Sequence, residues 1–167
     1  MATKTVNWTG GARAKKILGD LSLKLGTGAA VQVGFFADSR YTSSHPLRGT
    51  PRKPLPVAQV AFWNIYGTTK TPARDFMGVA IRGHQANYGK DLAAIAKFTG
   101  YDTKRTMAIM GERIQGQIVK QIVQWSQPPN SPRTVAIKGF NKPLIDDGTM
   151  QREVGYAVNG GTVVKGK

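Results

Sequence analysis

The segment from Thr103 to Trp125 carries a helical repeat of apolar residues. Asp102 and Thr103, at its start, are residue types that cap helix N-termini. The apolar side chains recur at three- and four-residue intervals and are Met107, Met110, Ile114, Ile118, Ile122 and Trp125. The pattern predicts a long helix with one apolar face, which another layer of the fold must cover.

The rest of the chain alternates helical and extended patterns. The expected elements are a basic amphipathic helix over residues 12–25, a half-buried strand over 30–36, a short helix over 56–66, a helix interrupted by three glycines over 74–97, and a hairpin of strands over 153–158 and 162–164. Residues 68–72 are expected to be extended, and residues 135–140 fit no single pattern. Helices with a small, mainly antiparallel sheet in a chain of 167 residues indicate a single α+β domain covering residues 1–167.

The chain is strongly basic. It has 24 Lys and Arg residues, 9 Asp and Glu residues and a formal net charge of +15, which favours a polyanionic partner such as DNA or an acidic protein surface. Residues 37–56 are rich in proline and poor in apolar residues, and they are expected to form a flexible basic loop. Arg40, Arg48, Arg52 and Lys53 in this loop are candidates for contact with DNA phosphates or with a protein partner. The alternative is a solvated loop without a partner.

The residue types of catalytic and metal sites are scarce. The chain has no cysteine, and its two histidines, His45 and His84, lie in separate segments. No metal, cofactor or Ser-His-Asp site is therefore expected. Asp146 and Asp147 are adjacent and precede a glycine, so a turn-forming role is favoured over acid-base chemistry. No stretch approaches the ~20 apolar residues of a membrane span, and the sequence predicts a soluble, non-enzymatic protein made in a cytoplasm.

Three aromatic residues lie close together in the short helix expected over 56–66. Phe62, Trp63 and Tyr66 are either part of the core or an exposed patch for a partner. Adjacent helical residues cannot share one face fully, so at least one of Phe62 and Trp63 is expected to meet a neighbouring subunit. Trp63 is the candidate for that contact.

Two stretches carry motifs of a known family. The first runs from Val60 to Met77 and contains Asn-x-x-Gly-Thr at the end of a helix, followed by Pro-Ala-Arg-x-Phe. The second begins at Trp125 and contains Pro-Asn-x-x-x-Thr, Lys-Gly and Pro-Leu-Ile-Asp-x-Gly-x-Met. In order and spacing these motifs resemble the signature of phage tail-completion, minor tail and head-tail joining proteins. Asp75 and Asp147 stand where that family usually has proline and threonine, and the loop over residues 38–56 is longer than usual.

The resemblance implies an architecture and a place in the virion. It implies two principal helices against the sheet and a ring of identical subunits, commonly six, in the neck of a phage particle. Such a ring joins the capsid portal, with its adaptor or head-closure proteins, to the tail tube. Duplex DNA passes through the ring, and the particle is assembled in the host cytoplasm. Because related ring proteins differ in such loops, the long loop leaves the layer of the neck open.

The motif residues also have physical roles. Gly67 and Gly148 suit turns with positive φ, and Arg74 and Lys138 can pair with carboxylates or with backbone carbonyls of a neighbouring subunit. The residues expected to shape the turns of the motifs are Asn64, Gly67, Pro72, Asn130, Pro143, Asp146 and Gly148.

Two other functions compete with a role in the neck. A basic DNA-binding accessory protein would bind with a steep salt dependence. A hydrolase would need a converging acid-base pair, which the sequence does not offer.

Overall fold

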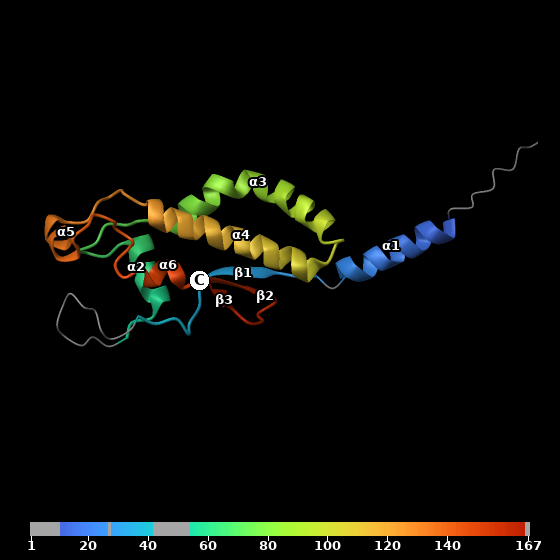
Figure 1. The fold of residues 1–167 in the computed structure, drawn as a ribbon, viewed down its shortest axis with the longest axis horizontal. Helices are drawn as coiled ribbons and strands as arrows, with labels where there is room; N and C mark the ends of the chain where they lie inside the picture. The colour runs from blue at the N-terminus through green and yellow to red at the C-terminus, as the bar shows by residue number, and fades with distance from the viewer. Residues whose placement is uncertain (1–10, 27, 42–53, 166–167) are drawn as a thin grey trace, which may run out of the picture.

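The structure is a computed structural model, and it has the α+β architecture expected from the sequence (Figure 1). It describes residues 11–26, 28–41 and 54–165, without the side chains of residues 11–14 and 25. The elements, in chain order, are α1 (Gly11–Gly26), β1 (Val31–Phe35), α2 (Val57–Tyr66), α3 (Phe76–Phe98), α4 (Thr103–Gln124), α5 (Pro132–Lys138), α6 (Thr149–Arg152), β2 (Val154–Val158) and β3 (Val164–Lys165).

The sheet is antiparallel, in the order β1-β2-β3. Val33 of β1 pairs with Tyr156 of β2, which in turn pairs with Val164 of β3. Asn159 and Gly160 follow β2 with φ values of 53° and 69°, the conformation that Asn-Gly favours in tight turns. The hairpin predicted at the C-terminal end is thus confirmed.

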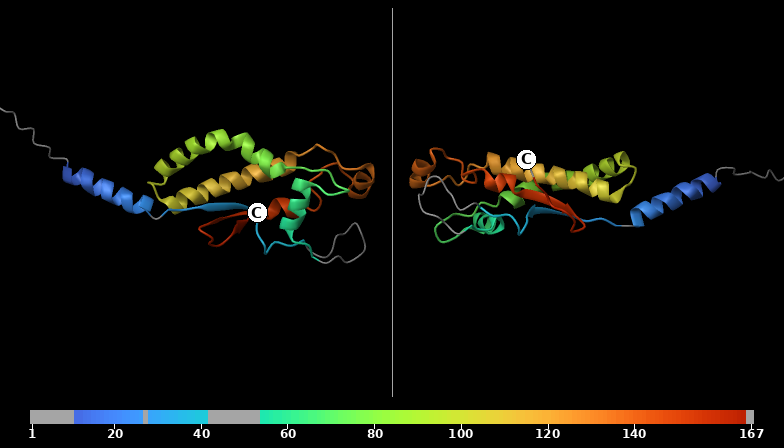
Figure 2. Two further views of the ribbon diagram at one scale, coloured as in Figure 1. Left: turned by 180° about the vertical axis from the view of Figure 1, so that it is seen from behind. Right: turned by 60° about the horizontal axis from the view of Figure 1, so that its bottom comes forward.

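Helix α4 lies between α3 and the sheet, so the molecule has three layers (Figures 1 and 2). Asp102 caps α4 as predicted, because its carboxylate accepts a hydrogen bond from the backbone N of Arg105 at 3.0 Å. Gly111 faces the sheet, where a Cβ would lie 2.7 Å from Val31 Cγ2 and 2.8 Å from Tyr156 Cδ2. Glycine at this position therefore lets the helix approach the sheet closely.

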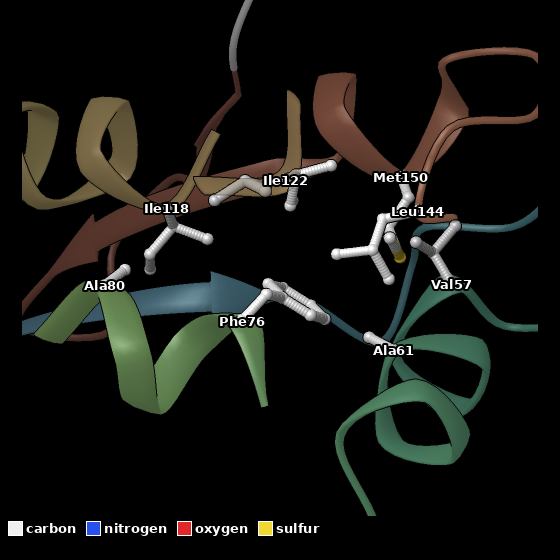
Figure 3. Packing of buried hydrophobic residues seen from close by; sticks show 9 residues of the cluster. Val57, Ala61, Phe76, Ala80, Ile118, Ile122, Leu144 and Met150 are labelled. Carbon is white, nitrogen blue, oxygen red and sulfur yellow. The ribbon is translucent and has the colours of Figure 1, made fainter. Parts of the chain in front are cut away.

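The core lies where α3, α4 and the sheet meet α2 and the C-terminal segment (Figure 3). Phe76 of α3 is fully buried and packs edge-on against Phe35 of β1, with ring centroids 6.2 Å apart. The buried apolar cluster consists of Val57, Ala61, Phe76, Ala80, Ile118, Ile122, Leu144, Met150 and Val154. Two of the anchors predicted for α4 are thus at the centre of the fold, and segments far apart in sequence enclose them.

Helix α3 is continuous, so the interruption predicted at Gly78, Gly83 and Gly89 is wrong. Asp75 caps the helix by accepting a hydrogen bond from the backbone N of Gly78 at 2.9 Å, and it also pairs with Arg82 at 2.9 Å. Each glycine costs a helix only ~1 kcal/mol. The capping contacts and the packing along α4 outweigh that cost.

The connection after α2 is a tight turn, and the extended conformation predicted for residues 68–72 is wrong. The backbone N of Thr68 donates to the carbonyl O of Thr71 at 2.8 Å, and the N of Thr71 donates to Thr68 Oγ1 at 3.1 Å. The hydroxyl of Thr68 accepts a hydrogen bond from the backbone and so stabilises the turn relative to an extended segment.

Two short helices were not predicted. Helix α5 starts at Pro132 after Ser131, whose Oγ accepts a hydrogen bond from the backbone N of Thr134 at 3.3 Å, and it ends at Gly139 with φ of 78°. Helix α6 is a single turn between Gly148 and β2.

Helix α1 confirms the helix predicted over 12–25 and projects from one end of the molecule (Figures 1 and 2). Its C-terminal end is held by Lys24, whose Nζ donates to the carbonyl O of Gly100 at 3.2 Å. None of the helices in the described ranges is both long and apolar enough to cross a membrane.

Candidate functional site

The two motif-bearing stretches meet at the side chain of Arg74. Its guanidinium Nε donates to the carbonyl O of Pro128 at 3.1 Å, and Nη2 donates to that of Pro129 at 3.2 Å. The side chain is only 4% exposed, and this burial lowers the pKa of Arg74 from its ordinary value. A guanidinium presents several donors in one plane, which suits it to holding two adjacent carbonyls. Arg74 thus ties the α2–α3 connection to the α4–α5 connection, and we call this contact the motif junction.

Lys138 closes the loop that follows α5. Its Nζ donates to the carbonyl O of Lys142 at 2.8 Å and to that of Ile145, and it lies 5.1 Å from the ring centroid of Phe140. Burial lowers the pKa of Lys138, although the carboxylate of Asp146 acts in the opposite direction.

Both motif cations donate to backbone carbonyls of their own chain, and their contact with a neighbouring subunit stays a prediction. Arg74 is buried within the subunit. Lys138 is half-buried and donates to backbone carbonyls of its own chain. Both residues therefore order loops within the subunit.

Asp146 and Asp147 lie in a turn, and their charges act on the half-buried Tyr41. Asp147 Oδ1 accepts a hydrogen bond from the backbone N of Thr149 at 2.8 Å, and Gly148 has φ of 78°. Burial acts to raise the pKa of Asp147, but hydrogen bonds from Thr149 outweigh it, and the pKa lies below its ordinary value. Burial, with the charges of Asp147 and Asp146, raises the pKa of Tyr41. The turn-forming role predicted for this pair agrees with the hydrogen bond of Asp147.

Asn64 lies in the last turn of α2, and Gly67 and Pro72 lie in the connection between α2 and α3. The carbonyl O of Asn64 accepts a hydrogen bond from the backbone N of Arg74 at 2.6 Å. Gly67 ends α2 with φ of 77°, and a Cβ there would lie 2.9 Å from the backbone N of Ala73. Glycine is therefore required at this turn, whereas Pro72 is exposed on its surface.

Asn130 and Pro143 lie in the connections on either side of α5. The backbone N of Asn130 donates to Asn141 Oδ1 at 3.1 Å, which joins these two connections. Pro143 is half-buried and directly precedes the core residue Leu144. The motif residues thus stabilise the turns and connections at this end of the molecule.

An apolar groove of about 570 Å³ lies between β1 and α2. It is lined by Gln32, Val33, Gly34, Phe35, Phe36, Ala37, Ala58, Ala61, Phe62, Ile65, Tyr66 and Met77. Successive residues of a strand point to opposite faces of a sheet, so a wall that includes every residue from 32 to 37 follows the edge of β1. Among the described residues β1 pairs only with β2, and the groove therefore lies along an unpaired strand edge.

The aromatic residues of α2 are not part of the core. Phe62 is 57% exposed, Trp63 is 37% exposed and Tyr66 is 70% exposed. The rings of Phe62 and Tyr66 lie 4.6 Å apart between centroids on the groove wall. The core alternative for these three side chains is wrong, and the exposed-patch alternative agrees with their exposure.

Of the four basic residues predicted to contact DNA or a partner, only Arg40 lies within the described residues. It is exposed and forms an antiparallel bridge with Pro56 at the base of the loop. Arg48, Arg52 and Lys53 lie outside the described residues, as does most of the loop predicted over 37–56.

The groove was not predicted from the sequence. Its α2 wall contains Ala58, Ala61, Phe62, Ile65 and Tyr66, which share one helical face by their spacing. Val57 and Ala61 of the same helix are buried in the core. Together these residues form one apolar arc of about half the helix circumference, which is wider than one core contact needs, and this signal was available in the sequence.

Within the described part of the chain, no group of three or more His, Cys, Asp or Glu side chains could hold a metal ion. A scan against protein-family models, a search of curated proteins and a search of solved structures each found no match for this chain.

Proposed function

We propose that this chain is a structural subunit of the neck of a tailed phage particle, as a tail-completion, tail-terminator or head-tail connector protein. Copies of the chain form a ring, commonly sixfold in the family that the motifs resemble. The ring joins the capsid portal or its adaptor to the tail and lets duplex DNA pass.

The observation that carries the proposal is the contact of Arg74 with Pro128 and Pro129. It joins the two motif-bearing stretches, which lie far apart in the sequence, in one structural unit. Both motifs supply helix ends, turns and buried hydrogen bonds. Motif residues that stabilise the fold in this way support a role in assembly. A hydrolase would instead need groups that converge for acid-base chemistry.

Exposed apolar surface also supports a role in assembly. Phe62 and Tyr66 lie exposed on one wall of the groove, and Ile17 and Leu18 lie exposed on α1. Exposed apolar patches of this kind mark surfaces that bind other proteins. The net charge of +15 agrees with DNA in the lumen of a ring.

The test is size-exclusion chromatography with light scattering on the purified chain, at low and high salt, with and without purified tail tubes. We expect either a ring-sized oligomer of three or more copies of the 18.1 kDa chain or a monomer that assembles on the ends of tubes. A monomer or dimer that ignores tubes, yet binds duplex DNA with an affinity that falls steeply as salt rises, would refute the proposal. That outcome would identify a DNA-binding accessory protein.

A further inference from the structure

Helix α1 exposes an apolar stripe that its own subunit does not cover. Ile17, Leu18 and Leu21 lie within one third of the helix circumference, and Ile17 and Leu18 are 57% and 65% exposed. An isolated helix of 16 residues is marginal in water, so its stability depends on packing of an apolar face. The stripe is therefore suited to a partner outside the subunit.

The stripe lies far from the groove of its own subunit. At the C-terminal end of α1, the Nζ of Lys24 donates to Gly100 O at 3.2 Å and the carbonyl O of Lys24 accepts from Thr103 Oγ1 at 3.5 Å. These contacts fix α1 beside the turn between α3 and α4. From there α1 runs ~24 Å away from the body, whereas α2 lies near the other end of the long axis (Figures 1 and 2).

The lining of the groove between β1 and α2 is apolar and uncharged, which is compatible with a basic apolar helix. None of the described residues that line it is charged, in a chain with a net charge of +15. Asp38 directly follows the groove residue Ala37 and pairs with Lys165 at 3.2 Å, and Asp75, two residues before Met77, pairs with Arg82 at 2.9 Å. The carboxylates next to the lining in sequence thus have cationic partners in their own chain, and the lining itself is uncharged. Lys15 and Lys16 are exposed on α1. A groove without positive charge is a place where two such basic chains can meet with little like-charge repulsion.

We propose that the apolar stripe of α1 in one copy docks in the groove between β1 and α2 of the next copy. This inference rests on the proposed function and names the contact that links the subunits of its ring. The contact is head-to-tail, because a surface at one end of the molecule meets a different surface near the other end. Head-to-tail contacts build closed rings when the rotation between copies closes. Docking of an amphipathic helix in an apolar groove is a common mode of protein recognition.

Cysteine cross-linking tests the contact directly, because the wild-type chain has no cysteine. Leu18→Cys and Tyr66→Cys are made in separate full-length chains, mixed, and treated with a short bismaleimide, so that any cross-link joins two copies. The matched control pairs Tyr66→Cys with Leu23→Cys, because Leu23 is 75% exposed on the opposite side of α1. The mixtures are examined alone and on purified tail tubes.

We expect the pair with Leu18→Cys to cross-link and the control pair to remain mostly uncoupled. Leu18→Ser is expected to weaken self-association at least about tenfold, since it removes apolar area that docking would bury, whereas Leu23→Ser leaves it unchanged. Both serine variants should melt like the wild-type monomer, because both side chains are exposed in the subunit.

The outcomes separate the inference from the proposed function. Rings that form, or tubes that are capped, without the cross-link of the Leu18→Cys pair would overturn the docking of α1 and leave the neck role standing. A selective cross-link in a chain that does not bind tail tubes would support the docking of α1 and refute the proposed role in the neck. Equal cross-linking of both pairs would also overturn the docking, because it would show that the stripe is not the surface in contact.

Discussion

Replacing Gly111 with alanine is expected to destabilise the fold, whereas the same replacement at Gly116 in the same helix is expected to stabilise it. A Cβ at position 111 would lie 2.7 Å from Val31 Cγ2 and 2.8 Å from Tyr156 Cδ2. Carbon atoms in favourable contact lie about 3.5–4.0 Å apart, so the added methyl would push α4 and the sheet apart. A Cβ at position 116 would have no neighbour within 4 Å.

The magnitudes of two opposing effects set the expected result. Alanine in place of glycine stabilises a helix interior by about 0.5–1 kcal/mol, and both variants have this gain. Overpacking a well-packed core costs about 1–3 kcal/mol, and only the variant at position 111 has this cost. Because β-branched Val31 is stiff at χ1, we expect the cost to exceed the gain. The two variants should differ by the overpacking cost itself.

Thermal unfolding followed by circular dichroism measures the difference, at one protein concentration because self-association shifts the melting temperature. For a chain of this size, 1 kcal/mol corresponds to about 2–4 °C. We expect Gly116→Ala to melt slightly above the wild type and Gly111→Ala to melt below it. A melting temperature for Gly111→Ala at or above that of Gly116→Ala would refute the close approach of α4 to the sheet.

Three further changes test the motif junction and the turns near it. Arg74→Lys should destabilise the chain by about 1.5–3 kcal/mol in urea unfolding, because an ammonium cannot hold both proline carbonyls in the plane of a guanidinium; an unchanged midpoint would contradict this. Gly67→Ala should lower the melting temperature more than Gly100→Ala, since both glycines have positive φ but only Gly67 lacks room for a Cβ; equal losses would contradict the clash. The pKa of Asp147 is lower in the folded chain, so its carboxylate stabilises the fold above the ordinary value of 3.8, and this contribution is lost as pH falls through the folded value. The stability difference between the wild type and Asp147→Asn should therefore shrink as pH falls below 3.8, and a difference independent of pH would disprove the assignment.

The elements that the sequence predicted well are those with a regular local pattern. Helix α4 has an N-cap at Asp102 and an unbroken apolar repeat, and the C-terminal hairpin has an Asn-Gly turn between alternating residues. These patterns report the local preferences of the chain. The continuity of α3 was not predictable in this way, because packing against α4 overrides the preference of three glycines.

The motif residues were identified from the sequence, but their partners were not. Arg74 bonds to the backbone carbonyls of Pro128 and Pro129, and Lys138 bonds to those of Lys142 and Ile145. Every residue has a carbonyl, so a sequence carries no mark of which carbonyl a buried cation will find. A carboxylate or a neighbouring subunit was equally compatible with the sequence, and only the fold distinguishes among them.

The same limit applies to α1 and α2, because the surfaces that cover their apolar faces could not be predicted from the sequence. An apolar stripe predicts that a face needs covering, but it does not say which surface covers it. In α2 the core covers Val57 and Ala61, while Phe62 and Tyr66 remain exposed along the groove. In α1 the stripe with Leu18 is left exposed by the subunit. The uncovered stripe of α1 and the groove beside α2 lie near opposite ends of the folded molecule, and a head-to-tail contact between copies would cover both at once.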